Sequence, residues 1–148
     1  YCCQTDGMVG LGCGARSYTR DLHYSFDYAV GVSPVRAILD DYVSRGPDGF
    51  DRAEVGFRLD DDERRRRHLL QSLLQADGVD PGLYRSRFGS DPRTDFPAEF
   101  ALLDERGWVV DGSGPVRLTE EGLAHSDAVG PLFFSARVNR LMAEYDAR

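Results

Sequence analysis

A glycine-rich stretch near the start of the chain combines residue types that suit ligand binding. Gly10, Gly12 and Gly14 precede Ala15 and Arg16. Because glycine has no Cβ, the backbone there can approach a ligand or a neighbouring strand closely. The guanidinium of Arg16 can pair with a carboxylate. A second interpretation stays open, in which the glycines serve packing and Arg16 makes a structural ion pair.

Aromatic side chains and a histidine follow directly. Tyr18, His23 and Tyr24 are the candidate substrate-side residues, and apolar residues recur at every second position over residues 22–30. This period predicts an extended, half-buried strand. Such aromatic residues can also simply form a hydrophobic core.

Other catalytic and metal-binding patterns are absent from the sequence. It contains no G-x-S-x-G nucleophile motif. Cys2, Cys3 and Cys13 are an odd number and match no zinc spacing, so we expect a reduced, cytoplasmic protein without a disulfide framework. His68 and His125 each stand alone in the sequence, and we expect both to be solvated or structural.

Charge and hydropathy exclude two classes of partner. The 148-residue chain carries 25 acidic and 18 basic residues, a net charge of −7, and every basic residue is arginine. This balance argues against nucleic acid as a partner, and the run of arginines at 64–67 follows four acids that cancel its charge. No apolar stretch reaches membrane-spanning length and no signal peptide is visible, so no membrane partner is expected.

The first half of the chain predicts strands around one helix. Residues 7–15 form an apolar run typical of a strand buried on both faces of a parallel sheet. Ser33 and Pro34 resemble a cap before an amphipathic helix over residues 35–43, which Gly46 and Pro47 end. Residues 55–59 alternate as a short strand.

The second half is mainly helical. Helices are expected over residues 60–74, 83–88 and 97–106, followed by short strands at 108–110 and 116–118. Thr119 caps the next helix, Gly130 and Pro131 break it, and an apolar stripe from 132 to 145 forms the last. Three helices before a two-stranded wing predict a winged-helix arrangement.

The apolar run at residues 7–15 needs neighbouring strands that nothing before it supplies. We therefore expect the chain to be the C-terminal piece of a larger protein. With its neighbours missing, this segment is expected to be disordered, to repack, or to self-associate with another chain along its open edge.

Three stretches together resemble the C-terminal portion of the oxygen-independent coproporphyrinogen III oxidase family. Residues 10–18 are similar to the family's G-x-G-x-x-A-x-S strand end, although Ala15 follows Gly14 directly and Arg16 replaces a histidine or apolar residue. Residues 59–74 are similar to its helix entering the C-terminal domain. Residues 107–109 and 116–122 are similar to its G-L-V and I-x-L-T-x-x-G segments.

The resemblance implies an α+β fold. Residues 1–58 would be the tail end of a radical S-adenosylmethionine barrel domain, contributing the last strand or strands of a partial β/α barrel. Residues 59–148 would be a mainly helical, winged-helix-like C-terminal domain.

The resemblance also implies a parent protein that uses S-adenosylmethionine and a [4Fe–4S] cluster for oxidative decarboxylation of propionate side chains in porphyrin biosynthesis. The family's C-x-x-x-C-x-x-C motif is absent here, so we expect the chain alone to be inactive, with no catalytic residue, metal or cofactor of its own. It implies cofactor contacts and a substrate side facing a tetrapyrrole-like small molecule. The implied cofactor-binding residues are Gly12, Gly14, Ala15 and Arg16, and the substrate-side residues are Tyr18, His23 and Tyr24.

Alternative functions remain. Relatives of this family include methyltransferases and haem-trafficking proteins. A winged-helix module acting through protein contacts is a second class. DNA binding is a third, which the acidic helix at residues 97–107 disfavours because its charge repels phosphate.

Overall fold

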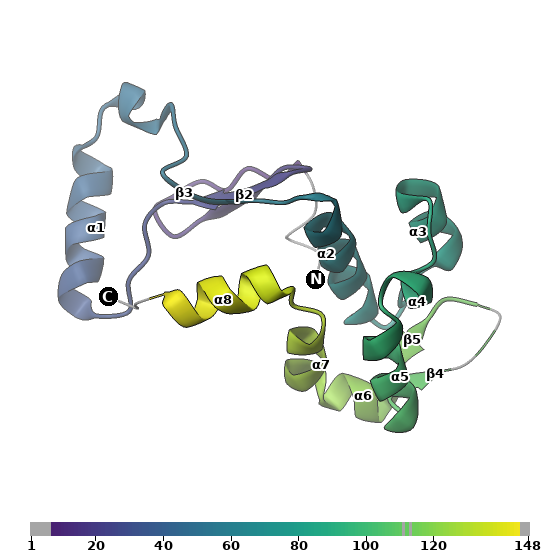
Figure 1. Cartoon of the computed structure of the whole chain (residues 1–148). Coiled ribbons are helices and arrows are strands. Elements are labelled where there is room, and N and C mark those ends of the chain that lie inside the picture. Colours follow the sequence, from purple (N-terminus) through teal and green to yellow (C-terminus); the bar gives the residue numbers. More distant parts are fainter. Residues whose placement is uncertain (1–6, 111, 113, 146–148) are drawn as a thin grey trace. The chain divides into compact units, whose positions relative to one another are not determined.

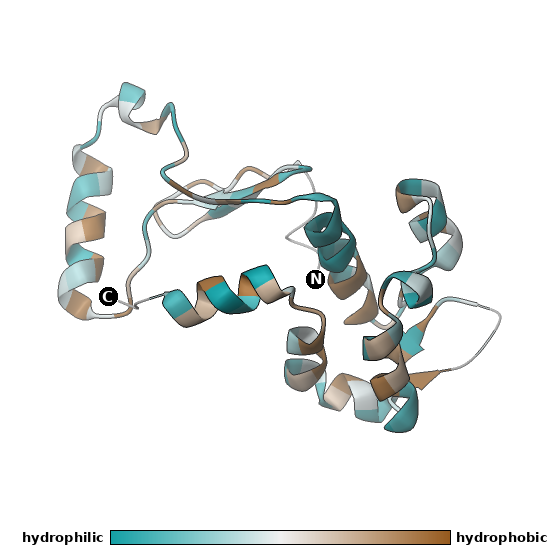
Figure 2. Ribbon diagram, in the orientation of Figure 1, coloured by the Kyte–Doolittle hydropathy of each residue, from teal (hydrophilic) through white to brown (hydrophobic). Residues whose placement is uncertain are grey.

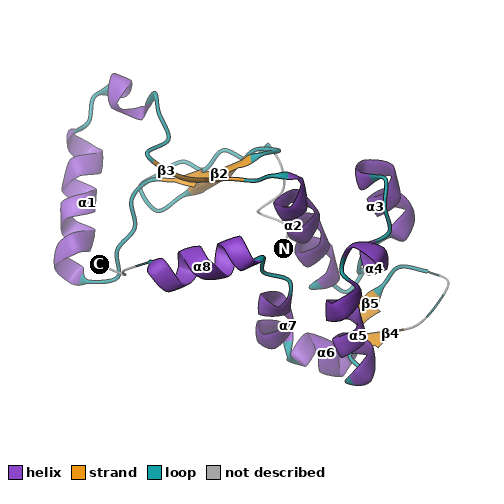
Figure 3. Cartoon of the chain, viewed as in Figure 1, coloured by secondary structure: helices purple, strands orange, loops and turns teal. Residues whose placement is uncertain are grey.

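The computed structural model describes residues 7–110, 112 and 114–145 (Figure 1). The chain divides into two compact units. Unit 1 comprises residues 1–64 with 141–148, and unit 2 comprises residues 65–140. The described residues form helices and two small antiparallel sheets, an α+β fold (Figure 3). None of the described helices combines the length and apolar character needed to span a bilayer.

The sheet of unit 1 is a three-stranded antiparallel meander. Its strands are β1 (Arg16–Tyr18), β2 (Leu22–Ser25) and β3 (Val55–Arg58), in that spatial order. The register places Ser17 opposite Tyr24 and Tyr18 opposite His23. Because directly opposed residues share a face and successive residues alternate, these two pairs lie on opposite faces of the sheet.

The prediction of a buried parallel strand over residues 7–15 is wrong. Met8 alone pairs, antiparallel to Tyr18, while Val9 and Leu11 are 66% and 92% exposed. The reason is local: Gly7 and Gly12 have φ values of +85° and +115°, which turn the backbone out of the extended conformation. Within the described residues the segment therefore repacks against its own chain.

The strand predicted over residues 22–30 is shorter than expected. Pairing with β3 ends where Ser25 faces Val55, and Phe26 lies beyond the sheet. The following helix α1 (Val32–Ser44) starts before Ser33, with Gly31 at the N-cap and no side-chain cap, so the expected Ser33 cap is wrong. A single 3₁₀ turn, η1 (Pro47–Phe50), follows α1 and was not predicted.

Helix α2 (Asp61–Leu73) was predicted from its acidic start and leucine-rich end. The Asp60 carboxylate accepts the Glu63 backbone N–H at 2.9 Å, which satisfies one of the unpaired donors of the first turn. Figure 2 shows the hydropathy change along this helix, from hydrophilic at its start to hydrophobic at its end. Leu69 and Leu73 are fully buried.

Unit 2 has a continuous hydrophobic core drawn from all of its helices except the last, and from its hairpin. Large aromatic side chains dominate this core, which suits a small unit because each buries a large apolar area. Its buried members are Leu69, Leu73, Val79, Tyr84, Phe96, Phe100, Leu103, Trp108, Val109, Leu118, Val129 and Phe133.

Three helices follow α2 in unit 2. Helix α3 (Pro81–Phe88) is capped by the Asp80 carboxylate, which accepts the backbone N–H groups of Gly82 and Leu83. The short helix α4 (Pro92–Asp95), which was not predicted, is capped by Asp91. Helix α5 (Pro97–Glu105) matches its prediction and buries Phe100 and Leu103.

The hairpin after α5 matches the predicted strand pair. Its strands β4 (Val109–Val110) and β5 (Arg117–Leu118) are antiparallel, and Val116 also exchanges two backbone hydrogen bonds with Val79. Gly78, at φ +72°, lies against this pairing, where an added Cβ would overlap the Val116 carbonyl.

The chain then forms α6 (Glu120–Ala124), α7 (Ser126–Leu132) and α8 (Ala136–Glu144). Thr119 caps α6 as predicted, accepting the Gly122 N–H at 3.1 Å. The break predicted at Gly130 and Pro131 is wrong, because α7 contains both and the interruption lies at His125. Gly130 has no Cβ to clash with the proline ring, so the helix continues through it. The last helix accordingly begins at residue 136, later than predicted.

Candidate functional site

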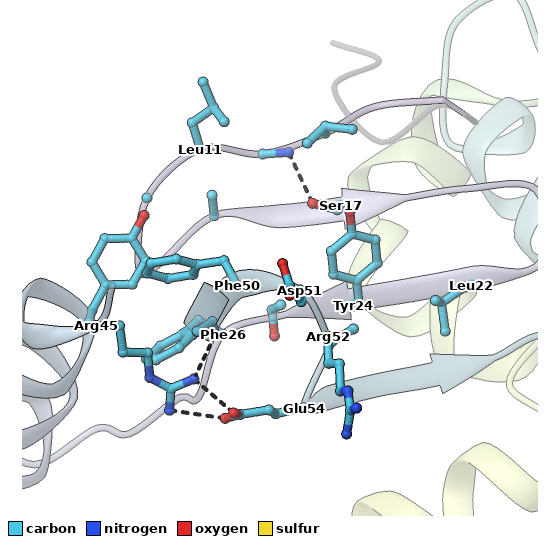
Figure 4. A pocket seen from close by; sticks show the side chains of 18 residues that line it. Leu11, Ser17, Leu22, Tyr24, Phe26, Arg45, Phe50, Asp51, Arg52 and Glu54 are labelled. Atoms are coloured by element: carbon cyan, nitrogen blue, oxygen red, sulfur yellow. Dashed lines mark hydrogen bonds and ion pairs between the residues drawn. The ribbon is translucent and has the colours of Figure 1, made fainter. Parts of the chain in front are cut away.

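A pocket of about 490 Å³ opens in unit 1 (Figure 4). Its walls are the glycine-rich turn, one face of the antiparallel sheet, three aromatic rings and the loop between η1 and β3. The volume falls within the range of small-molecule sites, roughly 300–1,000 Å³. The lining residues used below are Gly10, Gly12, Ala15, Ser17, Tyr24, Phe26, Tyr42, Arg45, Phe50, Asp51, Arg52 and Glu54.

The structure brings together only some of the predicted cofactor-binding residues. Gly12 and Ala15 line the pocket, whereas Gly14 and Arg16 are not among its lining residues. A Cβ added to Gly14 would meet nothing within 4 Å. Close approach within this chain therefore gives no reason for glycine at position 14.

Gly10 has a structural reason to be glycine. A Cβ there would overlap the Arg16 carbonyl, and its N–H donates to the Ser17 hydroxyl at 3.0 Å. Ser17 is 3% exposed, so this bond holds the glycine-rich turn against β1 in a largely dry environment. The packing explanation of the glycines therefore applies to Gly10 itself.

The predicted substrate-side residues divide between the two faces of the sheet. Tyr24 lines the pocket together with Ser17. Tyr18 and His23 form the cross-strand pair on the other face, with ring centroids 4.3 Å apart and an interplanar angle of 22°. Tyr18 is 4% exposed, so its ring is occupied by packing.

An aromatic cluster forms one end of the pocket. The rings of Phe26, Tyr42 and Phe50 meet at centroid distances of 5.1 to 6.4 Å. The guanidinium of Arg45 lies 4.6 Å from the centroid of the Phe26 ring, a cation–π contact. The cluster is thus an aromatic surface that already stacks one cation.

Arg45 connects α1 to the loop before β3. It donates to Glu54 at 2.8 Å and to Asp41 at 2.7 Å, and also to the Gly49 carbonyl. The hydrogen bonds from Glu54 and then Asp41 raise the pKa of the Arg45 guanidinium above its ordinary value. Arg45 therefore stays charged and neutralised in place rather than being available to an anionic ligand.

Sequence reasoning missed much of this pocket. Phe26 had been assigned to a strand, Tyr42 to a helix stripe, and Phe50 and Asp51 to no motif. Their convergence depends on the turn of the chain after Ser25 and on η1. Only a weak signal existed, namely the aromatic residue directly beside an aspartate at positions 50 and 51.

The arginine run at residues 64–67 pairs differently from the sequence expectation. Arg64 pairs with Asp61 at 2.8 Å, within the acidic segment. Arg65 and Arg66 instead pair with acids of other elements of unit 2, which are Asp95 and Glu99 respectively. Arg66 also donates to the Phe133 carbonyl and stacks on the Phe96 ring. These two side chains serve packing, and the exclusion of nucleic acid stays a prediction.

The two lone histidines have structural surroundings. The ring of His68 lies near Tyr84 and Phe88, at centroid distances of 5.9 and 5.5 Å. The ring of His125 stacks on Trp108 at 4.6 Å.

The described residues contain no group of three or more His, Cys, Asp or Glu residues that could hold a metal ion. Cys13 is a free thiol, and Cys2 and Cys3 lie outside the described residues.

No family model matches this sequence, and no curated protein matches it significantly. The fold is similar to that of coproporphyrinogen III oxidase (HemN) from Escherichia coli, a radical SAM enzyme, with a TM-score of 0.61 and 18% sequence identity. The similarity covers 84% of this chain and 27% of that one, so the chain spans about a quarter of the length of the solved protein. At this identity the likeness concerns the fold, and it shows that the chain resembles a region of that enzyme.

Proposed function

We propose that this chain is the C-terminal region of a radical S-adenosylmethionine protein similar to oxygen-independent coproporphyrinogen III oxidase. The observation that carries the proposal is the fold similarity over 84% of the chain. The ordered resemblance of three sequence stretches supports it independently. The region covers the substrate side of the parent protein, where it positions a tetrapyrrole-like substrate and excludes water from the radical reaction. The cognate reaction is propionate decarboxylation, with a methyltransferase or haem-trafficking relative as the alternative parent.

The residues of this chain do not fit an iron–sulfur cluster. Such clusters are held by cysteine thiolates, and the sequence has no C-x-x-x-C-x-x-C motif. No step through a cluster can therefore be assigned to these residues. On the proposal, the cluster belongs to a part of the parent protein outside this chain.

The fit to S-adenosylmethionine is partial. Gly12 and Ala15 border the pocket, where their small size permits a ligand to approach the backbone. Arg16 lies outside the lining, so it is the weakest of the proposed cofactor contacts. Tyr24 can orient a planar group across the sheet face, while Tyr18 and His23 are stacked on the opposite face.

The proposed domains are residues 1–58, attached to the barrel, and residues 59–148, the winged-helix-like region. The described strands at 16–58 are antiparallel, which differs from the parallel strands of a β/α barrel. This segment therefore contributes as an extension of the barrel wall rather than through its own barrel strands. Self-association through residues 7–15 stays a prediction.

The test begins with the complete open reading frame that contains this sequence. A C-x-x-x-C-x-x-C motif upstream of Tyr1 is expected. The full-length protein, reconstituted with iron and sulfide, should then release 5′-deoxyadenosine from S-adenosylmethionine, and more of it when coproporphyrinogen III is present. A reading frame without the cysteine triad would contradict the proposal. Radical formation without any response to coproporphyrinogen III would instead favour one of the other relatives.

A further inference from the structure

The pocket of unit 1 contains a carboxylate that no protein cation neutralises. Within the described residues, no hydrogen bond or ion pair engages the side chain of Asp51. Figure 4 shows this carboxylate turned toward the interior of the pocket, whereas the neighbouring Arg52 extends away from it. The other guanidinium of the lining, that of Arg45, is already held by Asp41 and Glu54.

Aromatic rings surround the same space. Phe50 adjoins Asp51 in the sequence and packs against Phe26 and Tyr42, and Tyr24 lines the pocket from the sheet. The faces of aromatic rings carry negative potential and attract cations, most strongly when water is partly excluded. The contact of Arg45 with Phe26 shows that this cluster accepts a positive group at one ring already.

We propose that this pocket binds a small organic cation, a sulfonium or alkylammonium group, with Asp51 as its charge partner and Phe50 and Tyr24 as aromatic walls. A carboxylate beside several rings is the arrangement that distinguishes a positive group from its neutral isostere. An anionic ligand would face Asp51 without a free guanidinium inside the pocket.

The proposal goes beyond the proposed function, because it rests on the contacts of unit 1 alone. Two sources supply the same chemistry: the sulfonium of S-adenosylmethionine and the ammonium of an unrelated amine. The two are separated by paired probes. S-adenosylmethionine is compared with S-adenosylhomocysteine, which lacks only the methyl group and the sulfonium charge. Choline is compared with 3,3-dimethylbutan-1-ol, its neutral isostere.

The experiment is isothermal titration calorimetry of the 148-residue chain at low ionic strength. At least one cation should bind about tenfold more tightly than its neutral partner. Asp51→Asn should remove most of this preference while leaving the neutral probe unchanged. The matched control is Asp40→Asn, which removes the same charge from an exposed position of α1 outside the pocket lining and should bind as the wild type does.

A second variant keeps the test decisive if Asp51→Asn misfolds. Phe50→Leu preserves an apolar side chain but removes the ring, and it should lower the affinity for the cation more than that for its isostere. A preference for S-adenosylmethionine alone identifies the sulfonium source, and one for choline alone identifies an amine; both support the proposal. Equal binding of cation and isostere, no binding of any probe at millimolar concentration, or equal losses in Asp51→Asn and Asp40→Asn would overturn it. None of these outcomes depends on radical formation by the longer protein.

Discussion

Gly122 lies so close to the carbonyl oxygen of Trp108 that a Cβ at this position would overlap it. The same added atom would also lie 3.1 Å from the Trp108 Cβ and 3.2 Å from the Leu118 Cβ. Gly122 is therefore the point at which α6 packs directly on the β4–β5 hairpin. This contact explains the glycine of the L-T-x-x-G segment, which the sequence offered only as a resemblance.

Gly122→Ala is expected to destabilise the chain by about 2 kcal/mol, because overpacking forces backbone or side-chain shifts. Urea unfolding followed by tryptophan fluorescence measures the effect. Gly112→Ala is the matched control, since the nearest atom to its added Cβ is 4.0 Å away. Its stability should stay within about 0.5 kcal/mol of the wild type. Equal stability of the two variants would show that the close contact is not maintained.

The cap at Thr119 supplies a second test at the same helix. Thr119→Ala removes the acceptor of the Gly122 N–H and should cost about 1 kcal/mol of unfolding free energy. Thr119→Ser keeps the hydroxyl and should restore most of that loss. A serine variant as unstable as the alanine variant would assign the effect to the lost methyl group rather than to the cap.

Tyr84 and Asp95 form a polar contact at the edge of the unit 2 core. The fully buried Tyr84 donates its hydroxyl to Asp95 at 2.8 Å, and Ser90 donates to the same carboxylate oxygen at 2.6 Å. Tyr84→Phe should lower the unfolding free energy by about 1 kcal/mol, because Asp95 keeps its other partners. Tyr28→Phe, at a side chain that is 56% exposed, should change nothing measurable in the same denaturation experiment.

Trp108 is the single tryptophan of the chain, so its fluorescence reports on one site. It is 6% exposed and is covered by the stacked ring of His125 and by the guanidinium of Arg106 at 4.8 Å. His125→Ala should shift the emission maximum to longer wavelength, because water gains access to the indole. His23→Ala removes a histidine that stacks on Tyr18 instead and should leave the emission spectrum unchanged. An unshifted His125→Ala spectrum would contradict the stacked arrangement.

Local signals predicted unit 2 well. Hydrophobic spacing located α2, α3 and α5, and the threonine and aspartate caps mark helix starts through contacts within three residues. The hairpin followed from two short apolar segments around a glycine-rich turn. The break placed at Pro131 failed because the preceding residue is glycine, which relieves the usual steric conflict.

The sequence alone determined the helices of unit 2, the antiparallel hairpin and the absence of a cluster-binding cysteine motif, because each depends on residues close together in the chain. Tertiary structure decided which residues share the unit 1 pocket. It placed Tyr24 on one face of the sheet and His23 on the other, and it brought Phe26 and Asp51 to the same pocket. The physical reason is register: a one-residue step along a strand reverses the face of its side chain, and that register is set by pairing with β3, about thirty residues away.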